Sequence, residues 1–316
     1  MSRTTHFSRG ACVAASLALC SLAASAQAPK KAPAPGPVKP AAIPAFQEAT
    51  LSNGLRIMLV ESKRQPVVSL ALMLPAGDAY DPAGKEGLAS IVASVITKGA
   101  AARTADQVSS AIEGVGGSIG ASSGTDFMTV RANVLAEDAP LAFELVGDAV
   151  AKPTFDGKEV ELARTQTLSA LQLEQSQPGA LASKFFAAQL FGAHPYGEHP
   201  TPGTVRALTN DDLRMFQKSR LAPTGALLVV AGEITLARTK ELAQKYFGSW
   251  SGTAPAVATR PQPTTRTKTE ILLVHRPGSV QSNIIVGNLT HAPSSPSYYA
   301  LTVASRILGG GSDGRL

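Results

Sequence analysis

The stretch that decides the fold runs from residue 51 to residue 99 and reads LSNGLRIMLVESKRQPVVSLALMLPAGDAYDPAGKEGLASIVASVITKG. Its first four residues have turn composition. Two runs of strand length follow, over residues 56–61 and 67–74, with a polar turn between them. The hydrophobic period then changes, because residues 87–98 carry apolar side chains at the spacing of a half-buried helix. The stretch therefore predicts two strands followed by a helix, which Gly99 ends.

The same mixture of strands and helices continues beyond residue 99. Strands are predicted within residues 118–134 and over residues 226–231. A helix is predicted over residues 104–115, with Thr104 as its N-cap. Further helices are predicted over residues 138–151, 156–176, 179–191, 209–218 and 235–247. Because strands and helices do not alternate strictly, the pattern predicts an α+β fold.

The composition is that of a folded protein. The chain has 316 residues, of which 44% are hydrophobic and 16% charged, so it is too apolar to be disordered and is long enough for about two domains. Its formal net charge of +6 does not gather into a basic stripe, which argues against nucleic-acid binding. Beyond the N-terminus, no apolar run is long enough to predict a transmembrane segment.

Residues 1–26 have the organisation of a secretory signal peptide. Two arginines precede an apolar run too short to span a bilayer, and Ala24-Ser25-Ala26 is a small-x-small cleavage pattern. We expect cleavage after Ala26, with cleavage after Ala28 as the alternative, and a periplasmic mature protein. Both cysteines lie in the signal, so the mature chain would have no thiol chemistry. A lipoprotein signal ending at Cys20 is a further alternative, against which the bulky Leu19 argues.

The rest of the chain is predicted to consist of two domains with linkers. Residues 27–44 are rich in Ala, Pro and Lys and form a tether, residues 45–250 form the first domain, and residues 251–266 are a second linker. Residues 267–316 repeat the opening of the first domain. Strand-like runs at 270–274 and 283–286 precede an apolar helix over residues 298–308 and a glycine run. This second copy stops after about 50 residues, where the first takes about 200, which indicates a truncated domain.

Several short motifs point to chemistry, but their contexts do not support it. Gly120-Ala121-Ser122-Ser123-Gly124 fits the nucleophile-elbow pattern, yet a strand rather than a helix is predicted after it. The glycines near residues 114–120 and 309–314 lack the strand-to-helix context of a phosphate loop. His194 and His199 are five residues apart among prolines, so they cannot share a helix face as zinc ligands do. A surface turn is the preferred interpretation, and a loop that closes around a metal is the alternative.

An ordered series of short motifs resembles the pitrilysin/insulinase-type zinc metallopeptidases, the group that includes mitochondrial processing peptidase. The resemblance runs from residue 46 to the end of the chain, and the order and spacing of the motifs carry it. The motifs are LSNGLR at 51–56, PAG at 75–77, GLA at 87–89, KG at 98–99, GAHPYG at 192–197, LT at 208–209, LVVAGE at 228–233, RPGSVQS at 276–282 and ILGGG at 307–311. The resemblance implies an α/β sandwich domain, in which helices cover a mixed sheet, followed by the start of a second homologous domain.

The resemblance also implies where zinc chemistry would lie. Active members carry H-x-x-E-H on the helix after Gly-Leu-Ala, with two histidine ligands and a glutamate that activates water. Those positions hold Ser90, Ala93 and Ser94 here, and the third ligand position falls on or near Ala170, beside Ser169. Hydroxyl and methyl groups cannot replace two imidazoles and a carboxylate around zinc. We therefore expect no metal ligands, no catalytic residues and no cofactor in this chain, with zinc in an active partner subunit.

The family resemblance further implies a partner and a peptide site. Bacterial and organellar members of the family often work as heterodimers in which a metal-free subunit supports a zinc-bearing one. Their substrates add as a strand to a sheet edge, which corresponds here to Ser118, Ile119, Gly120, Ala121 and Ser122. An ordinary edge strand is the alternative interpretation of these five residues. The Arg and Tyr that the metal-free subunit supplies come from late in its second domain, so no residue of this chain is assigned to that role.

The sequence thus predicts an exported, catalytically inactive insulinase-like peptidase subunit that pairs with a zinc-bearing homologue to support peptide degradation. The alternatives are a stand-alone peptide-binding module, a truncated non-functional remnant, and an enzyme with an unrecognised site. Zinc content and peptide cleavage by the chain alone and in a mixture with a partner distinguish the first prediction from the rest.

Overall fold

The computed structural model describes residues 44–255, 260–263, 266–311 and 314–315. The predicted signal peptide and nearly all of the predicted tether at 27–44 lie outside the described residues, so both remain predictions. The elements are β1 (Gln47–Thr50), β2 (Arg56–Glu61), β3 (Val67–Leu74), η1 (Asp78–Tyr80), α2 (Leu88–Val95), α3 (Ala105–Glu113), β4 (Ser118–Ser123), β5 (Met128–Leu135), η2 (Ala136–Asp138), α4 (Ala139–Ala151), α5 (Gly157–Glu174), α6 (Pro178–Phe191), η3 (Pro195–Gly197), α7 (Pro202–Arg206), α8 (Asn210–Arg220), β6 (Leu227–Gly232), α9 (Leu236–Phe247) and α10 (Tyr298–Gly309).

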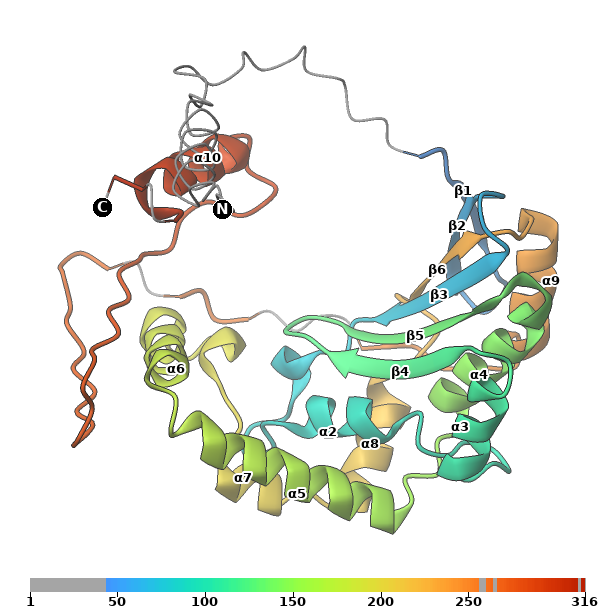
Figure 1. Cartoon of the computed structure of the whole chain (residues 1–316), viewed down its shortest axis with the longest axis horizontal. Helices are drawn as coiled ribbons and strands as arrows, with labels where there is room; N and C mark the ends of the chain where they lie inside the picture. The colour runs from blue at the N-terminus through green and yellow to red at the C-terminus, as the bar shows by residue number, and fades with distance from the viewer. Residues whose placement is uncertain (1–43, 256–259, 264–265, 312–313, 316) are drawn as a thin grey trace, which may run out of the picture. The chain divides into compact units, whose positions relative to one another are not determined.

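The strands form a six-stranded mixed sheet with the order β1-β2-β6-β3-β5-β4 (Figure 1). β2 and β6 run parallel, and the other neighbouring strands run antiparallel. β6 comes late in the chain and inserts between β2 and β3, so the two strands predicted in the opening stretch are not direct neighbours. The edges of the sheet are β1 and β4.

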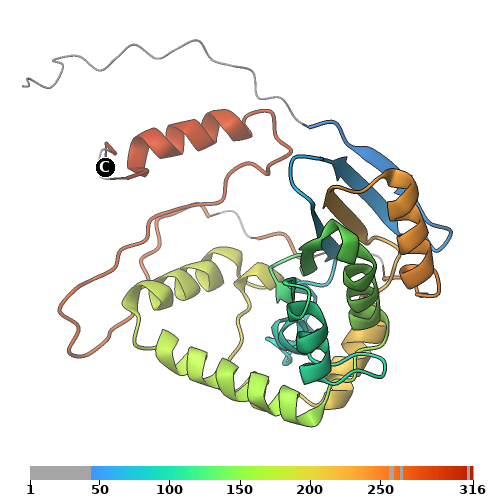
Figure 2. The same ribbon diagram turned by 45° about the vertical axis from the view of Figure 1, so that its right-hand side comes forward.

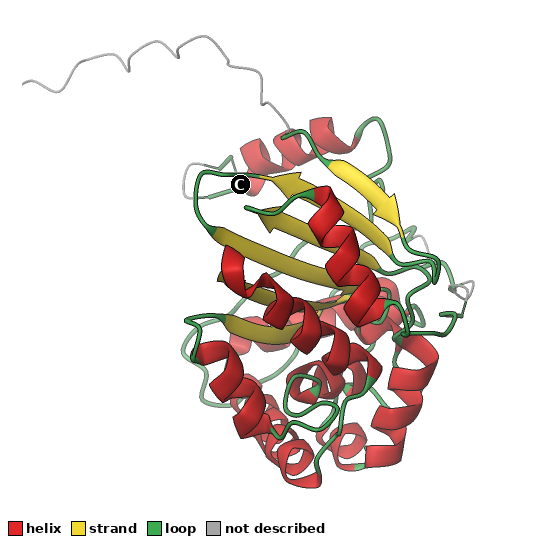
Figure 3. Ribbon diagram, turned by 90° about the vertical axis from the view of Figure 1, so that its right-hand side faces the viewer, coloured by secondary structure: helices red, strands yellow, loops and turns green. Residues whose placement is uncertain are grey.

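One face of the sheet is buried under helices, which confirms the predicted α+β architecture. Side chains alternate between buried and half-buried along β3 and β6, as expected when one face meets a core. α2 contacts β4 and β5, α4 contacts β3 and β5, and α9 contacts β2. Figure 3 shows helices of this layer crossing in front of the strands. Phe143 and Phe247 are fully buried between α4 and α9 and meet edge to face, with ring centroids 6.4 Å apart.

Local sequence signals explain most of the element boundaries. β2 and β3 occupy the predicted residues, and the predicted cap Thr104 starts α3 in a capping box with Gln107. The predicted turn before β2 contains Gly54 with a φ of +91°, a conformation that favours glycine. α2 is shorter than predicted and has Ile96 as its C-cap, before Gly99. α5 and α6 follow one another along one side of the domain (Figure 2).

The predicted strands at 270–274 and 283–286 are wrong, because neither segment pairs in a sheet. Their apolar side chains are largely exposed: Ile271 is 91% and Ile284 is 84% accessible. Two such segments without further strands are at best marginal as a sheet, which accounts for the difference. The helix predicted after them is present as α10. Among the described residues, no helix combines the length and apolarity required to cross a membrane.

Candidate functional site

The first turns of α2 carry the positions to which the family resemblance assigns zinc chemistry. Ala93 is buried with 2% exposure, whereas Ser90 and Ser94 are exposed. The Ser94 hydroxyl donates to the carbonyl of Ile91, 2.7 Å away, within its own helix. α2 contacts α5, where Ser169 and Ala170 are exposed. The Ser169 hydroxyl also turns back, donating to the carbonyl of Thr165 at 2.9 Å.

The Ser90 hydroxyl belongs to a hydrogen-bonded group that joins α2 to the end of β4. Ser90 and Ser123 both donate to the same carboxylate oxygen of Asp78, at 3.0 Å and 2.7 Å. Backbone bonds fix Asp78 itself, because its N–H donates to the carbonyl of Gly124 at 2.9 Å. We call Asp78, Ser90 and Ser123 the serine–aspartate cluster. It links the helix of the expected zinc motif to the edge strand.

These residues do not fit a zinc ion. Zinc sites in proteins use imidazole, thiolate and carboxylate ligands. The four positions offer two hydroxyls and two methyl groups, and the neighbouring Asp78 carboxylate already accepts from two serines. Within the part of the chain that the structure describes, no three His, Cys, Asp or Glu side chains are grouped so as to hold a metal. No reaction step through zinc can therefore be assigned to this chain.

The N-terminus of α2 is capped by Asp81, a residue that sequence reasoning missed. Its N-cap Gly87 has no side chain to accept a hydrogen bond. Asp81 supplies the acceptors instead, taking the N–H of Gly87 at 2.7 Å and that of Ala89 at 2.8 Å. Burial raises the pKa of Asp81 from 3.8 to about 7, and Asp78 adds to the rise, while the backbone donors oppose it. The signal in the sequence was a glycine at a helix start with an aspartate shortly upstream.

Replacement of Gly77 should disrupt the attachment of η1 to the β4–β5 turn. A Cβ atom there would lie 2.3 Å from the Gly124 carbonyl oxygen and 2.5 Å from that of Thr125, both of them backbone atoms. The clash would break three backbone hydrogen bonds that residues 77–79 donate to residues 124–126. At about 1 kcal/mol each, Gly77→Ala should lower the free energy of unfolding by about 3 kcal/mol, measured by urea denaturation.

Gly157→Ala is the matched control for Gly77→Ala. A Cβ at Gly157 meets nothing within 4 Å, and the residue lies in the first turn of α5. This variant should be neutral or more stable, because alanine has the higher helix propensity. Equal stability of the two variants would show that the contact of η1 with the β4–β5 turn is not as tight as described.

β4 is the edge strand that carries the predicted peptide-binding residues 118–122. Ile119 and Ala121 pack against the core, whereas Ser118 and Ser122 are exposed. Arg131 of β5 donates to the Ser122 hydroxyl at 3.2 Å. No atom lies within 4 Å of the position that a Cβ on Gly120 would take. β4 pairs only with β5 among the described strands, so its other side presents backbone donors and acceptors.

The two histidines of the predicted surface turn have different surroundings. His194 caps η3 by accepting the N–H of Tyr196 at 3.1 Å, and its ring packs on that of Tyr196. Burial, followed by the nearby Arg260, lowers the pKa of His194. Burial also lowers the pKa of His199, followed by the charge of Lys184. The structure therefore gives His194 a role in the turn.

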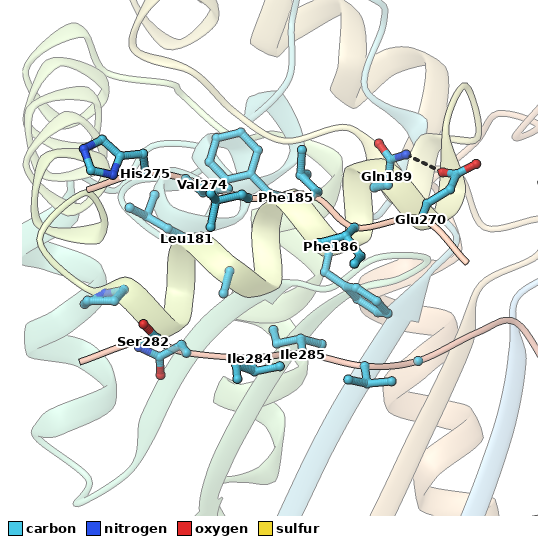
Figure 4. Close-up of a pocket in the computed structure, with 18 of the residues that line it drawn as sticks. Leu181, Phe185, Phe186, Gln189, Glu270, Val274, His275, Ser282, Ile284 and Ile285 are labelled. Carbon is cyan, nitrogen blue, oxygen red and sulfur yellow. Dashed lines mark hydrogen bonds between the residues drawn. The ribbon is translucent and has the colours of Figure 1, made fainter. Parts of the chain in front are cut away.

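A cavity of about 1270 Å³ lies between α6 and residues 266–288. Figure 4 shows Leu181 and Phe185 of α6 facing it, with Val274 and Ile284 on the two segments that were predicted as strands. Gln189 of α6 donates to the Glu270 carboxylate at 2.8 Å. Arg266 also contacts Glu270, so this carboxylate is already paired. The cavity is mainly apolar, and its carboxylate is already bonded. We therefore place the candidate site at α2 and β4.

Comparison with known proteins matches both parts of the chain to one family. Residues 56–200 match the family described as insulinase (peptidase family M16), and residues 207–316 match the peptidase M16 inactive domain. An uncharacterized zinc protease of Mycobacterium tuberculosis is 27% identical over 90% of this chain and 66% of its own length. Subunit 1 of the bovine mitochondrial cytochrome b-c1 complex is 26% identical over 67% of this chain and 44% of its own length. The chain thus spans 66% or less of the length of these relatives.

Solved structures agree on the fold. A crystal structure of a peptidase M16 inactive domain from Pseudomonas fluorescens superimposes with a TM-score of 0.72 at 22% identity, covering 86% of this chain and 66% of that one. The periplasmic protease PqqL from Escherichia coli superimposes with a TM-score of 0.63 at 17% identity, covering 69% of this chain and 25% of its own. With its mixed sheet, its helical layer and matches that extend from residue 56 to the end, the chain belongs to the insulinase family of peptidases, M16.

Proposed function

We propose that this chain is a non-catalytic subunit of an insulinase-type peptidase, which holds extended peptides at the β4 edge while a zinc-bearing homologue cleaves them. One observation carries the proposal. The positions of the family's zinc motif hold Ser90, Ala93 and Ser94, and both hydroxyls are bonded within the chain, while the neighbouring edge strand is open. Chemistry would then come from the partner and peptide binding from this subunit.

The edge strand supports the peptide part of the proposal. An added strand would gain main-chain hydrogen bonds from β4, and the small side chains of residues 118–122 would let its backbone approach closely. Gly120 leaves the space above the strand free. The serine–aspartate cluster holds the end of β4 against α2, so the edge is fixed before a peptide arrives. A preorganised edge lowers the entropic cost of binding.

Pairing and export are part of the same proposal. Relatives that carry the words zinc protease in their names support a zinc-bearing homologue as the partner, since this chain's own residues do not fit the ion. Export rests on the signal-like residues 1–26, and the likeness in fold to a protease described as periplasmic is compatible with it. A stand-alone peptide-binding module remains the competing function, and it differs in needing no partner.

Enlarging Gly120 should weaken peptide binding without unfolding the chain. Gly120→Trp adds an indole to the face of β4, where it would clash with the cross-strand side chains of a peptide paired beside the strand, and no atom lies within 4 Å of the new Cβ position. We expect a loss of about tenfold in affinity for a fluorescein-labelled extended peptide, equivalent to about 1.4 kcal/mol, measured by fluorescence anisotropy.

Gly120→Ala is the matched control and should bind within about twofold of the wild type, since its methyl group fills open space. Circular dichroism should show both variants folded. If Gly120→Trp binds the peptide as tightly as the wild type does, peptides do not dock on β4, and this part of the proposal is wrong.

A further inference from the structure

Three residues from separate elements surround the guanidinium of Arg260. Asp126 of the β4–β5 turn pairs with it, with Nη1 3.0 Å from Oδ1. The ring of Tyr80 in η1 lies 4.7 Å from the guanidinium carbon, and the ring of Tyr196 in η3 lies 5.7 Å from it. One carboxylate and two aromatic rings are the groups that recognise a guanidinium, by ion pairing and by cation–π contact. We call Tyr80, Asp126 and Tyr196 the guanidinium cage.

Bonds that do not involve Arg260 hold the cage together. The Tyr196 hydroxyl donates to Oδ2 of Asp126 at 2.6 Å, which orients the carboxylate. The N–H of Gly77 donates to the Asp126 carbonyl at 3.2 Å, tying η1 to the turn, and η1 also contacts η3. The guanidinium of Arg220 also lies over the Tyr80 ring, 4.8 Å from the ring centroid. The cage is therefore built by the folded domain and does not require its present occupant.

The occupant comes from a segment that the sequence predicts to be a linker. Arg260 lies in the Pro/Thr/Ala-rich stretch predicted as residues 251–266. Its side chain is only 16% exposed, and among the residues that the structure describes none forms a hydrogen bond with its buried Nη2. A guanidinium normally satisfies its donors in a fork with a carboxylate, and here Oδ2 of Asp126 is taken by Tyr196. Arg260 is thus held by one ion-pair contact through Nη1 and by its contacts with the two rings.

The position of the cage relates it to the peptide edge. Asp126 lies in the turn that directly follows β4, and the same turn is bonded to Asp78 of the serine–aspartate cluster. A peptide lying along β4 would run toward this turn.

We propose that the guanidinium cage binds an arginine side chain of a peptide held on β4, and that Arg260 is an intramolecular competitor for it. This inference rests on the proposed function and adds a preference for arginine to it. A residue held on the same chain acts at an effective concentration of the order of millimolar, so a peptide arginine must bind the cage strongly enough to displace Arg260. Removal of Arg260 should therefore expose a latent arginine site.

The test uses the full chain and Nα-acetyl-L-arginine amide, with the citrulline compound as a neutral control of the same shape. Arg260→Ala should bind the arginine compound at least tenfold more tightly than the wild type does, by isothermal titration calorimetry. Arg260→Gln is a second variant, which keeps a polar side chain but removes the guanidinium, and it should bind the arginine compound as Arg260→Ala does. Asp126→Asn introduced with Arg260→Ala should remove the gain, and citrulline should bind neither variant.

Equal binding of the arginine compound by the wild type and both Arg260 variants would overturn the proposal, as would equal binding of citrulline. A measurement on the wild type covers the case in which both variants misfold. Saturating arginine compound should displace Arg260, which moves its Nε–H resonance to the position of a solvated arginine. An unmoved resonance contradicts the competition.

A pair of labelled peptides separates this inference from the proposed function. The two peptides differ only in arginine or citrulline at one position. If both bind the wild type equally and both are weakened by Gly120→Trp, the β4 edge binds peptides and the cage is not an arginine site. If neither binds any variant while the small arginine compound does bind, the cage is real and the β4 proposal fails.

Discussion

Phe143→Ala should lower the free energy of unfolding by about 3–5 kcal/mol, a large part of the 5–15 kcal/mol typical of a domain. Phe143 is fully buried in α4, and its ring packs edge to face on Phe247 of α9. The substitution removes the transfer free energy of the ring and leaves a cavity where α4 and α9 meet. Chemical denaturation followed by far-ultraviolet circular dichroism measures the loss.

Phe46→Ala is the matched control, because the same side chain is half exposed at the start of the described chain. It should change the free energy of unfolding by no more than about 0.5 kcal/mol. A loss of less than about 1 kcal/mol for Phe143→Ala would contradict the core described between α4 and α9.

The stability of the wild type relative to Asp81→Asn should fall as the pH rises from about 4 to about 8. The folded pKa of Asp81 is raised from 3.8 to about 7, so the folded state holds a proton that the unfolded state has lost. The stabilising contribution is fully present below pH 3.8 and disappears as the pH passes through about 7. With 1.36 kcal/mol per pKa unit, the total change approaches about 4 kcal/mol.

Urea denaturation of both proteins at several pH values measures this change. Groups common to both proteins cancel in the difference, which isolates Asp81. Asp211→Asn removes a carboxylate whose side chain is 85% exposed and reports the effect of losing one surface charge. A difference between wild type and Asp81→Asn that rises with pH would mean that the Gly87 and Ala89 donors dominate and hold the pKa below its ordinary value.

The fold could be predicted where local signals are strong. β2 and β3 are apolar runs of strand length separated by a polar turn, and Thr104 is a cap residue at the start of a helical pattern, which the structure completes as a capping box with Gln107. β1 was missed because its four residues, QEAT, have no buried side chain and no alternation. The segments at 270–274 and 283–286 have strand composition, but a strand also needs a neighbour, which composition does not reveal.

The candidate site could be predicted only as far as residues near in sequence determine it. The sequence itself shows that Ser90, Ala93 and Ser94 stand where the zinc motif has its histidines and glutamate. It also shows the small residues of the strand at 118–122. The cap of α2 by Asp81 and the pairing of Ser90 with Asp78 depend on how η1 folds back on the helix. The guanidinium cage joins residues from positions 80, 126 and 196 to Arg260, and no local pattern connects them.

Peptide cleavage by the chain alone and in a mixture with a zinc-bearing homologue, with bound zinc quantified in each purified protein, tests the central claim most directly. The account predicts no stoichiometric zinc and no cleavage for this chain alone, and cleavage of an unstructured peptide by the mixture at a rate well above that of the homologue alone. The Gly120→Trp variant should reduce that enhancement. Stoichiometric zinc in this chain, or cleavage by this chain alone, would contradict the account.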